Sequence, residues 1–219
     1  MDKKKLMMIA VAVAMVLTLC GVTGYYWYMG TYYVRTDDAR VDGTIVNVSP
    51  QITGRISEIY VAEGDTVKEG ALIARQVDYS LSQGVNLDMA VIKSPINGTV
   101  IKKIGNVGEV GTPGQPIVMV TDLGNVYITA DVEETEVSKI RPGQPVDFTV
   151  DAFPRVKFTG QVSSVVNATV STFSLLSSQN TGGNFTKVVQ RVSVKISIND
   201  AKGCRLMPGM NSTVKIHVR

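Results

Sequence analysis

The sequence predicts a mainly β protein carried on one N-terminal membrane-spanning helix. Three observations lead to this fold class: an uncharged apolar segment over residues 6–29, a glycine-containing motif that occurs twice, and alternating apolar residues in three later segments. Apolar residues make up 44% of the 219 residues, which is typical of a chain with packed cores.

The apolar segment over residues 6–29 is expected to cross a membrane. At about 1.5 Å per residue, a helix of this length exceeds the roughly 30 Å hydrocarbon core of a bilayer. Lysines precede it and charges of both signs follow, so residues 1–5 are expected in the cytoplasm and the following domains outside. The residues expected at the membrane surfaces are Lys3, Lys4, Lys5, Tyr25, Tyr26, Trp27 and Tyr28.

Two other interpretations of this segment fit less well. A cleaved signal peptide would have a shorter apolar stretch and a cleavage site of small residues. A lipoprotein signal ending at Cys20 would need a small residue before the cysteine, where Leu19 stands. We therefore expect a single-pass membrane protein.

Residues 52–78 and 96–122 repeat one motif. Four residues of the kind found in turns have an identical counterpart 44 positions later, in the pairs Gly54 and Gly98, Gly64 and Gly108, Gly70 and Gly114, and Asp78 and Asp122. Glycines at constant spacing predict turns with positive φ between short strands. Since neither copy has enough apolar residues for a core, we expect the two to pair face to face as a small β-sandwich.

Residues 125–219 are expected to form a second β domain, a small barrel. Apolar residues alternate at Val126, Ile128, Ala130 and Val132, at Val146, Phe148 and Val150, and at Val192, Val194, Ile196 and Ile198. Such alternation predicts strands with one buried face. Residues 133–140 are expected to form two helical turns before Pro142, and the polar residues 170–186 an exposed loop.

The repeat and the later strands resemble a known family. "ITGRISEIYVAEGDTVKEGALIARQVD" and "SPINGTVIKKIGNVGEVGTPGQPIVMVTD" are similar to the two half-motifs of the biotinyl/lipoyl fold in HlyD-type periplasmic adaptors, also called membrane fusion proteins. "VYITADVEETEVSKIRPGQPVDFTVDAFPRVKFTGQV" resembles their β-barrel. "NFTKVVQRVSVKISI" and "LMPGMNSTVKIHV" resemble the closing barrel strands of EmrA-type adaptors, which serve major-facilitator drug exporters.

The resemblance implies a domain order. After the helix at 6–29 come a linker and leading strand at 30–43, a lipoyl-like domain at 44–124, and a barrel domain at 125–219 with its loop at 170–186. The halves of the lipoyl-like domain are residues 44–78 and 91–124, joined by a short connection at 79–90.

The resemblance also implies a function, that of a membrane-anchored adaptor subunit in a multidrug or small-molecule efflux system. Such an adaptor couples a cytoplasmic-membrane transporter to an extracytoplasmic passage, as a homo-oligomer. A major-facilitator partner is favoured and an ABC partner stays open. A stand-alone envelope module that binds or senses a ligand is the alternative function.

The connection between the halves differs both from that of biotinyl or lipoyl carriers and from that of the better-known adaptors. It contains no lysine, so it offers no attachment point for biotin or lipoyl. Even as one helix, its residues would reach only about 20 Å, too short for the long coiled-coil hairpin of adaptors that meet outer-membrane channels. Contact with an outer-membrane channel is therefore doubtful.

The composition argues against catalysis, metal binding and nucleic-acid binding. Residues 94–111 also resemble strands of lysostaphin-type metallopeptidases, which bind zinc through several histidines and an aspartate. The chain has a single histidine, His217, which cannot supply such a site. We expect no catalytic residue, no cofactor and no metal. Beyond residues 1–5 the chain carries 19 basic and 18 acidic residues, which is too balanced for a phosphate-binding face.

Six residues are candidates for a partner interface: Phe173, Leu175, Leu176, Lys187, Gln190 and Arg191. The first three are apolar residues in a polar stretch, and either dock a partner or pack back onto the barrel. The last three match the "KVVQR" motif of the resembled family. Hydrogen bonding at the barrel edge and contact with substrate are the two roles open to them.

Overall fold

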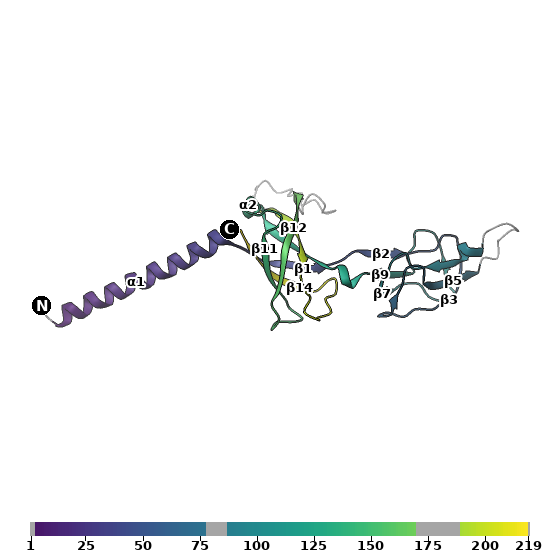
Figure 1. The fold of residues 1–219 in the computed structure, drawn as a ribbon, viewed down its shortest axis with the longest axis horizontal. Helices are drawn as coiled ribbons and strands as arrows, with labels where there is room; N and C mark the ends of the chain where they lie inside the picture. The colour runs from purple at the N-terminus through teal and green to yellow at the C-terminus, as the bar shows by residue number, and fades with distance from the viewer. Residues whose placement is uncertain (1–2, 78–86, 170–188, 219) are drawn as a thin grey trace, which may run out of the picture. The chain divides into compact units, whose positions relative to one another are not determined.

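The computed structural model describes residues 3–77, 87–169 and 189–218, which fold as two units. One unit contains the N-terminal helix and a closed β-barrel, from residues 1–40, 128–202 and 211–219. The other contains two four-stranded sheets, from residues 41–127 and 203–210. Figure 1 labels their helices and strands. The mainly β fold with one N-terminal helix is as predicted.

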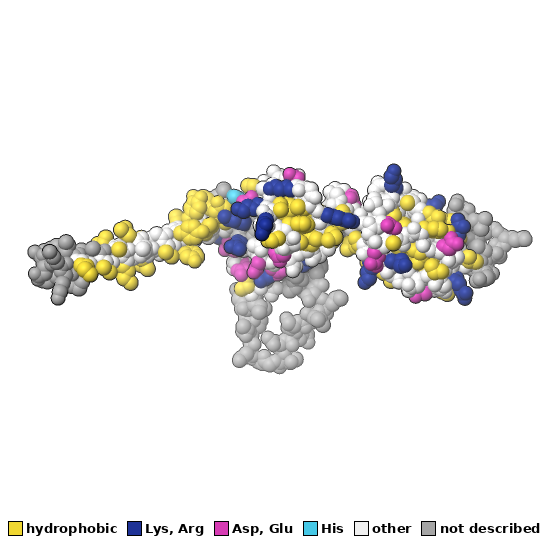
Figure 2. All heavy atoms as spheres, turned by 90° about the horizontal axis from the view of Figure 1, so that it is seen from below, with side chains coloured by type: hydrophobic (Ala, Val, Ile, Leu, Met, Phe, Trp, Pro, Cys, Tyr) yellow, Lys and Arg dark blue, Asp and Glu magenta, His cyan; other side chains and the backbone are white. Residues whose placement is uncertain are grey.

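Helix α1 spans Lys3–Tyr32, and its segment Val11–Tyr32 is long and apolar enough to cross a membrane. None of that segment is buried against the protein, and hydrophobic side chains cover its surface in Figure 2. The helix continues past Met29, where the predicted span ended. Residues 30–43 were expected to form a linker and a leading strand. The strand is present as β1, but it follows the last turn of α1 without a linker and belongs to the barrel.

The barrel strands are β1 (Tyr33–Asp42), β10 (Tyr127–Glu133), β11 (Pro145–Val150), β12 (Phe158–Thr169), β13 (Arg191–Ile198) and β14 (Asn211–His217). They close in the order β1-β10-β13-β12-β11-β14. The alternation in the sequence sets the inward face: Ile128, Ala130, Val146, Phe148, Val150, Val194 and Ile196 are each at most 2% exposed. Phe148 and Phe158 stack at 5.3 Å between ring centroids inside the barrel.

The helix predicted at residues 133–140 is only one turn long. Helix α2 spans Glu134–Val137, and the chain then closes two tighter turns, from the Lys139 amide to the Glu136 carbonyl and from the Ile140 amide to the Val137 carbonyl. These three-residue bonds turn the chain inward, so that Ile140 is buried in the barrel core. Burial of Ile140 thus ends the helix before Pro142 is reached.

The second unit holds the repeat. Its first copy supplies β2 (Ile45–Val48), β3 (Gly54–Ile59), β4 (Thr66–Val67) and β5 (Leu72–Val77). The second copy supplies β6 (Val91–Lys93), β7 (Gly98–Lys103), β8 (Val110–Gly111) and β9 (Val118–Thr121). Short 3-10 helices lie at Leu87–Ala90 and Leu123–Asn125.

The copies form a sandwich, but each sheet combines strands of both copies. The sheet orders are β2-β9-β7-β4 and β6-β5-β3-β8. Replacing each strand of the first sheet by its counterpart in the other copy gives the second sheet. The expectation that the copies stack face to face is wrong in this respect. The turns explain why: the Gly64 amide donates to the Val100 carbonyl, and the Gly108 amide to the Ile56 carbonyl, each at 2.8 Å, so each copy crosses into the other.

Four glycines make these crossings possible. Gly64 and Gly108 have φ of 95° and 93°, and Gly70 and Gly114 have φ of 78° and 85°. A side chain is strained in this region of φ. The positive φ predicted from the constant spacing is confirmed at these four glycines, whereas Gly54 and Gly98 are the first residues of β3 and β7 and do not have positive φ.

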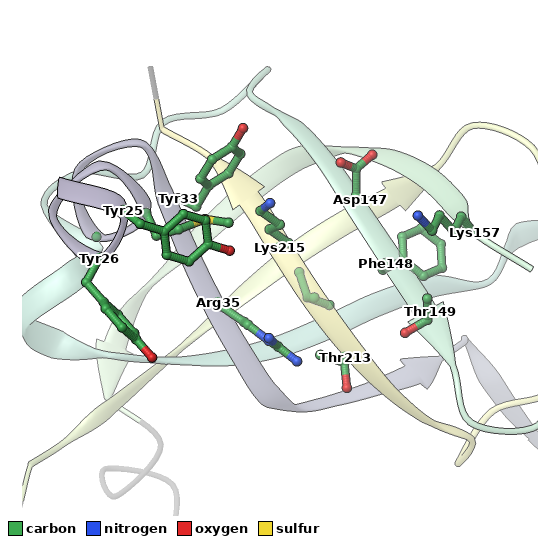
Figure 3. A pocket seen from close by; sticks show the side chains of 13 residues that line it. Tyr25, Tyr26, Tyr33, Arg35, Asp147, Phe148, Thr149, Lys157, Thr213 and Lys215 are labelled. Atoms are coloured by element: carbon green, nitrogen blue, oxygen red, sulfur yellow. The ribbon is translucent and has the colours of Figure 1, made fainter. Parts of the chain in front are cut away.

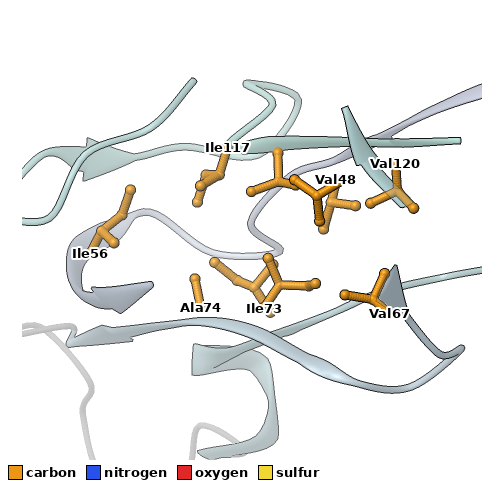
Figure 4. Packing of buried hydrophobic residues seen from close by; sticks show 10 residues of the cluster. Val48, Ile56, Val67, Ile73, Ala74, Ile117 and Val120 are labelled. Atoms are coloured by element: carbon orange, nitrogen blue, oxygen red, sulfur yellow. The ribbon is translucent and has the colours of Figure 1, made fainter. Parts of the chain in front are cut away.

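One core of aliphatic residues lies between the two sheets (Figure 4). Val48, Ile56, Ile73, Val100, Val118 and Val120 are each at most 3% exposed. Burying a side chain of this size contributes about 1.5–3 kcal/mol. Because both copies supply these residues, neither copy has a core without the other.

Candidate functional site

The candidate site is the end of the barrel unit where α1 stops. The backbone turns directly from α1 into β1, and the Val218 amide beyond β14 donates to the Tyr32 carbonyl at 3.0 Å. Lys139, just beyond α2, reaches the Gly30 carbonyl at 3.5 Å. This end of the barrel therefore lies beside the last turn of the candidate membrane span.

The aromatic residues predicted at the membrane surface lie on the last turns of α1. Tyr25, Tyr26 and Trp27 are 59%, 71% and 72% exposed, and Tyr28 is 49% exposed. Tyr28 stacks on Tyr32, with 4.5 Å between ring centroids. Rings in this position suit the layer between hydrocarbon and water. Lys3, Lys4 and Lys5 form the first residues of α1.

A pocket of about 760 Å³ lies between this end of α1 and the outer face of the barrel (Figure 3). Tyr25, Tyr26, Met29 and Gly30 line it from the helix, and residues of β1, β11 and β14 line it from the barrel. Three of its lining residues are basic, namely Arg35, Lys157 and Lys215, and one is acidic, Asp147. Figure 2 shows basic side chains gathered where the helix meets the barrel.

Asp131 is the buried carboxylate of the barrel wall. Its residue is 8% exposed, and its Oδ1 accepts a hydrogen bond from the Ser193 hydroxyl at 2.5 Å. Arg40 lies 3.9 Å from its Oδ2. A buried carboxylate needs such partners, so this group joins β1, β10 and β13.

Gln190 and Arg191, two of the candidate interface residues, lie at the start of β13. The Gln190 carbonyl accepts from the Glu134 amide at 2.9 Å, which ties α2 to the barrel. Arg191 forms an ion pair with Asp38 of β1, and both side chains are about half exposed. The other four candidates, Phe173, Leu175, Leu176 and Lys187, lie outside the described residues. The interface role of all six stays a prediction.

A smaller pocket of about 330 Å³ lies beside this ion pair. Its charged lining residues are Arg35, Asp37, Asp131, Glu133, Glu136 and Arg191. Within residues 3–77, 87–169 and 189–218, no group of three or more His, Cys, Asp or Glu residues is arranged to hold a metal ion. His217 instead contacts Asp147, with 2.7 Å from Nε2 to Oδ2.

Sequence reasoning missed the charged row across β1, β14 and β11. Arg35 lies directly opposite Lys215, and Lys215 directly opposite Asp147. Residues 33–42 carry a weak alternation of their own, with Val34, Ala39 and Val41 buried, and this was the available signal for a barrel strand. The partner strand lies about 180 residues away, so no local pattern could reveal the row.

Comparison with known proteins places both units in one family. The family model "RND MFP, barrel-sandwich hybrid domain" matches residues 44–123, and "YknX-like beta-barrel domain" matches residues 126–216. The chain is 36% identical to the "Putative efflux system component YhbJ" of Bacillus subtilis (strain 168), over 94% of this chain and 89% of that protein.

Two further similarities extend this result. The chain is 36% identical to the multidrug export protein EmrA of Escherichia coli (strain K12), over 60% of this chain but only 34% of that protein. Its fold is similar to the membrane fusion protein Spr0693 of Streptococcus pneumoniae R6, with a TM-score of 0.59 at 14% identity, over 85% of this chain and 99% of that one. With an apolar helix, a barrel and an intertwined sandwich in one chain, this protein belongs to the EmrA-like membrane fusion, or periplasmic adaptor, family.

Proposed function

We propose that this chain is the membrane-anchored adaptor subunit of a multidrug or small-molecule efflux system. The observation that carries the proposal is the match over 94% of the chain to YhbJ, which is named as an efflux system component. The similarity to a multidrug export protein supports the same role. In this role the chain couples a cytoplasmic-membrane transporter to an extracytoplasmic passage, and copies of it associate.

The proposed orientation puts the N-terminus in the cytoplasm and both folded units outside. Three lysines at positions 3–5 precede the span, and positive residues favour the cytoplasmic side. A fusion of alkaline phosphatase to the C-terminus tests this, since that enzyme folds only outside the cytoplasm. An inactive fusion, with an active fusion at the N-terminus, would reverse the orientation.

We place the transporter contact at the end of the barrel beside α1. A transporter in the same membrane meets this end of the barrel unit first, because the chain leaves the span at Tyr32. The half-exposed Arg191 and Asp38 and the exposed Glu133 provide polar groups there. A major-facilitator partner is preferred because the EmrA-type resemblance includes the strand that begins at Arg191.

Photo-crosslinking tests this placement. A crosslinker at Glu133 is expected to capture an integral-membrane transporter. A matched position is Asp200, which is also an exposed acidic residue but follows the other end of β13. Equal capture from both positions, or capture from Asp200 alone, would contradict the placement.

We also propose that the chain does no chemistry of its own, so that transport energy comes from the partner. The described residues offer ion pairs and hydrogen bonds rather than an activated nucleophile or a metal site. Because the connection at residues 79–90 is short, the proposed function does not include a direct contact with an outer-membrane channel.

Deletion of the gene tests the function as a whole. Loss of the adaptor is expected to raise drug accumulation and susceptibility, and the full-length chain is expected to restore export. Co-purification after crosslinking is expected to recover a transporter. Unchanged export together with a lost ligand response would instead favour the stand-alone envelope module.

A further inference from the structure

The outer face of the barrel holds two like charges directly opposite each other. Arg35 of β1 and Lys215 of β14 are register partners, and we call them the basic pair. Residues in this relation have Cβ atoms about 5 Å apart, and like charges there are destabilising. Within the described part of the chain, the guanidinium group of Arg35 has no hydrogen-bonding or ionic partner. An anion bound between these two positive charges would offset their repulsion, so this surface is suited to binding an anion.

Lys215 is held in place by an aromatic ring. Its Nζ lies 3.7 Å from the centroid of the Tyr33 ring, a cation–π contact. Tyr33 itself meets the His217 ring edge-on at 4.9 Å. Asp147, the register partner of Lys215 on its other side, has Oδ2 bound to His217 at 2.7 Å. The Asp147 carboxylate beside Lys215 is therefore shared with the histidine.

The basic pair faces the pocket of about 760 Å³ whose other wall is α1. Figure 3 shows Lys215 and Arg35 beside Tyr25 and Tyr26 of the helix, with Lys157 at the far side near Phe148. This volume is typical of small-molecule sites. The wall formed by the candidate span contains two tyrosines, and the barrel wall contains three basic residues and one acidic residue.

We propose that this pocket binds the phosphate of an anionic phospholipid headgroup, with the basic pair as its phosphate ligands. Arg35 can offer two parallel N–H groups to phosphate oxygens, and Lys215 a point charge. The inference rests on α1 spanning the membrane, which is part of the proposed function, but not on export.

The position of the pocket beside the end of α1 favours a lipid headgroup over a free anion as the ligand. The span of 22 residues ends at Tyr32, three residues before Arg35. Counted from Leu6, where the uncharged segment begins, a hydrocarbon core of about 30 Å takes up about 20 residues and ends near Tyr25. A headgroup layer of roughly 5–8 Å follows. Tyr25 and Tyr26 then lie near the edge of the hydrocarbon, and the part of the pocket lined by Met29 and Gly30 lies at the depth of the headgroups. Basic side chains close to an anionic membrane surface are attracted to its headgroups, by about 1 kcal/mol for each Lys or Arg.

Native mass spectrometry of the full-length chain can test the site. The protein is reconstituted in vesicles of phosphatidylcholine and phosphatidylglycerol in equal amounts, and the lipids that stay bound after gentle detergent release are counted. Wild type is expected to retain phosphatidylglycerol in preference to phosphatidylcholine. The double variant R35Q/K215Q is expected to reduce that preference about tenfold, because two basic contacts to an anionic headgroup are lost.

Two further variants separate the site from general charge and from folding. K102Q/K103Q removes the same two charges from exposed positions of the sandwich and is expected to leave the preference unchanged. R35K/K215R keeps both charges and is expected to restore most of it. Loss of preference in K102Q/K103Q to the same extent as in R35Q/K215Q would overturn the proposal.

Other outcomes would overturn the lipid assignment in distinct ways. If millimolar inorganic phosphate displaces the lipid as readily as soluble short-chain phosphatidylglycerol does, the pocket is a free-anion site. If the chain inserts into vesicles but shows no lipid preference, the site is wrong while the anchor stands. If the chain does not insert at all, the membrane span and the lipid site both fail, but the drug-export result can still stand.

Discussion

The sandwich unit and the barrel unit use unusual residues in different ways. In the sandwich, most special positions occur twice: Gly64 and Gly108 have nearly the same φ, and their amides make equivalent bonds 44 residues apart. In the barrel, Asp131 and the basic pair have no internal counterpart. A feature that both copies share is explained by the fold they share. Features that occur once, as in the barrel, are not explained by a repeat and have to be explained by their own contacts.

Gln76 shows how the symmetry of the sandwich is broken. Its counterpart is Val120, and both are buried. The Gln76 amide nitrogen donates to the Gly54 carbonyl at 3.0 Å and to the Gly111 carbonyl at 3.2 Å. These bonds lie within the sandwich itself, so this asymmetry serves the fold.

The largest expected effect separates two glycines that the repeat makes equivalent. A Cβ at Gly98 would lie 2.5 Å from the Thr121 carbonyl oxygen, whereas a Cβ at Gly54 would lie 3.3 Å from the Val77 carbonyl oxygen. Gly98→Ala is therefore expected to cost about 3 kcal/mol in the free energy of unfolding, and Gly54→Ala about 1 kcal/mol. Urea denaturation measures both. Equal costs would mean that the backbone of β9 moves as easily as that of β5.

The sandwich and the barrel also show how much of the fold could be predicted from the sequence. The offset of 44 residues identified the glycine turns, and the alternation at Val146, Phe148 and Val150 identified a barrel strand, because both are local patterns. The mixing of copies within each sheet was missed. It depends on which strand pairs with which, and Thr66 meets Thr99 only after the chain has crossed at Gly64.

The candidate site was predicted less completely for the same reason. The aromatic end of α1 was visible because its residues are contiguous. The basic pair was not, since Arg35 and Lys215 come from opposite ends of the sequence and meet only through the closure of the barrel. A strand was expected within residues 30–43, but its place in the barrel beside β14 depends on residues at the other end of the sequence.

A second prediction concerns a carboxylate that occurs only in the barrel. Asp131→Ala is expected to cost about 2 kcal/mol in the free energy of unfolding, because the Ser193 hydroxyl loses its acceptor in the barrel wall. Urea denaturation of the full-length chain measures the loss. Asp151→Ala, at an exposed position of the same barrel, is expected to change stability by less than about 0.5 kcal/mol. A neutral Asp131→Ala would show that this group is free to serve a partner.

A third prediction sharpens the symmetry within the sandwich. Gly64→Ala and Gly108→Ala are each expected to cost about 1 kcal/mol, because both residues have positive φ and neither would meet a neighbour within 4 Å. Equilibrium denaturation of the two variants gives the comparison. A difference larger than about 1 kcal/mol would show that one crossing supports the fold more than the other.

The smallest expected effect concerns a side-chain hydrogen bond to Glu109 in the second copy, in addition to the backbone bond that both copies have. Asp65 accepts from the Ala62 amide at 2.8 Å, and its counterpart Glu109 accepts from the Asn106 amide at 2.9 Å. Glu109 also accepts from the Asn106 side-chain amide at 3.0 Å. The Asn106 side chain and then its backbone amide hold the pKa of Glu109 below its ordinary value.

The lowered pKa of Glu109 determines how the free energy of unfolding depends on pH. A carboxyl whose pKa is lower in the folded chain stabilises the fold above its unfolded-state pKa, and that contribution is lost as the pH falls through the folded-state pKa. Glu109→Gln is therefore expected to be slightly less stable than wild type at pH 7. The difference should begin to shrink near the ordinary glutamate pKa of about 4.3 and disappear once the pH is below the folded-state pKa of Glu109. Urea denaturation at several pH values measures it, with Glu69→Gln as the control for losing one exposed negative charge. A gap that persists at low pH would assign the effect to packing in the Asn106 turn rather than to the charge of Glu109.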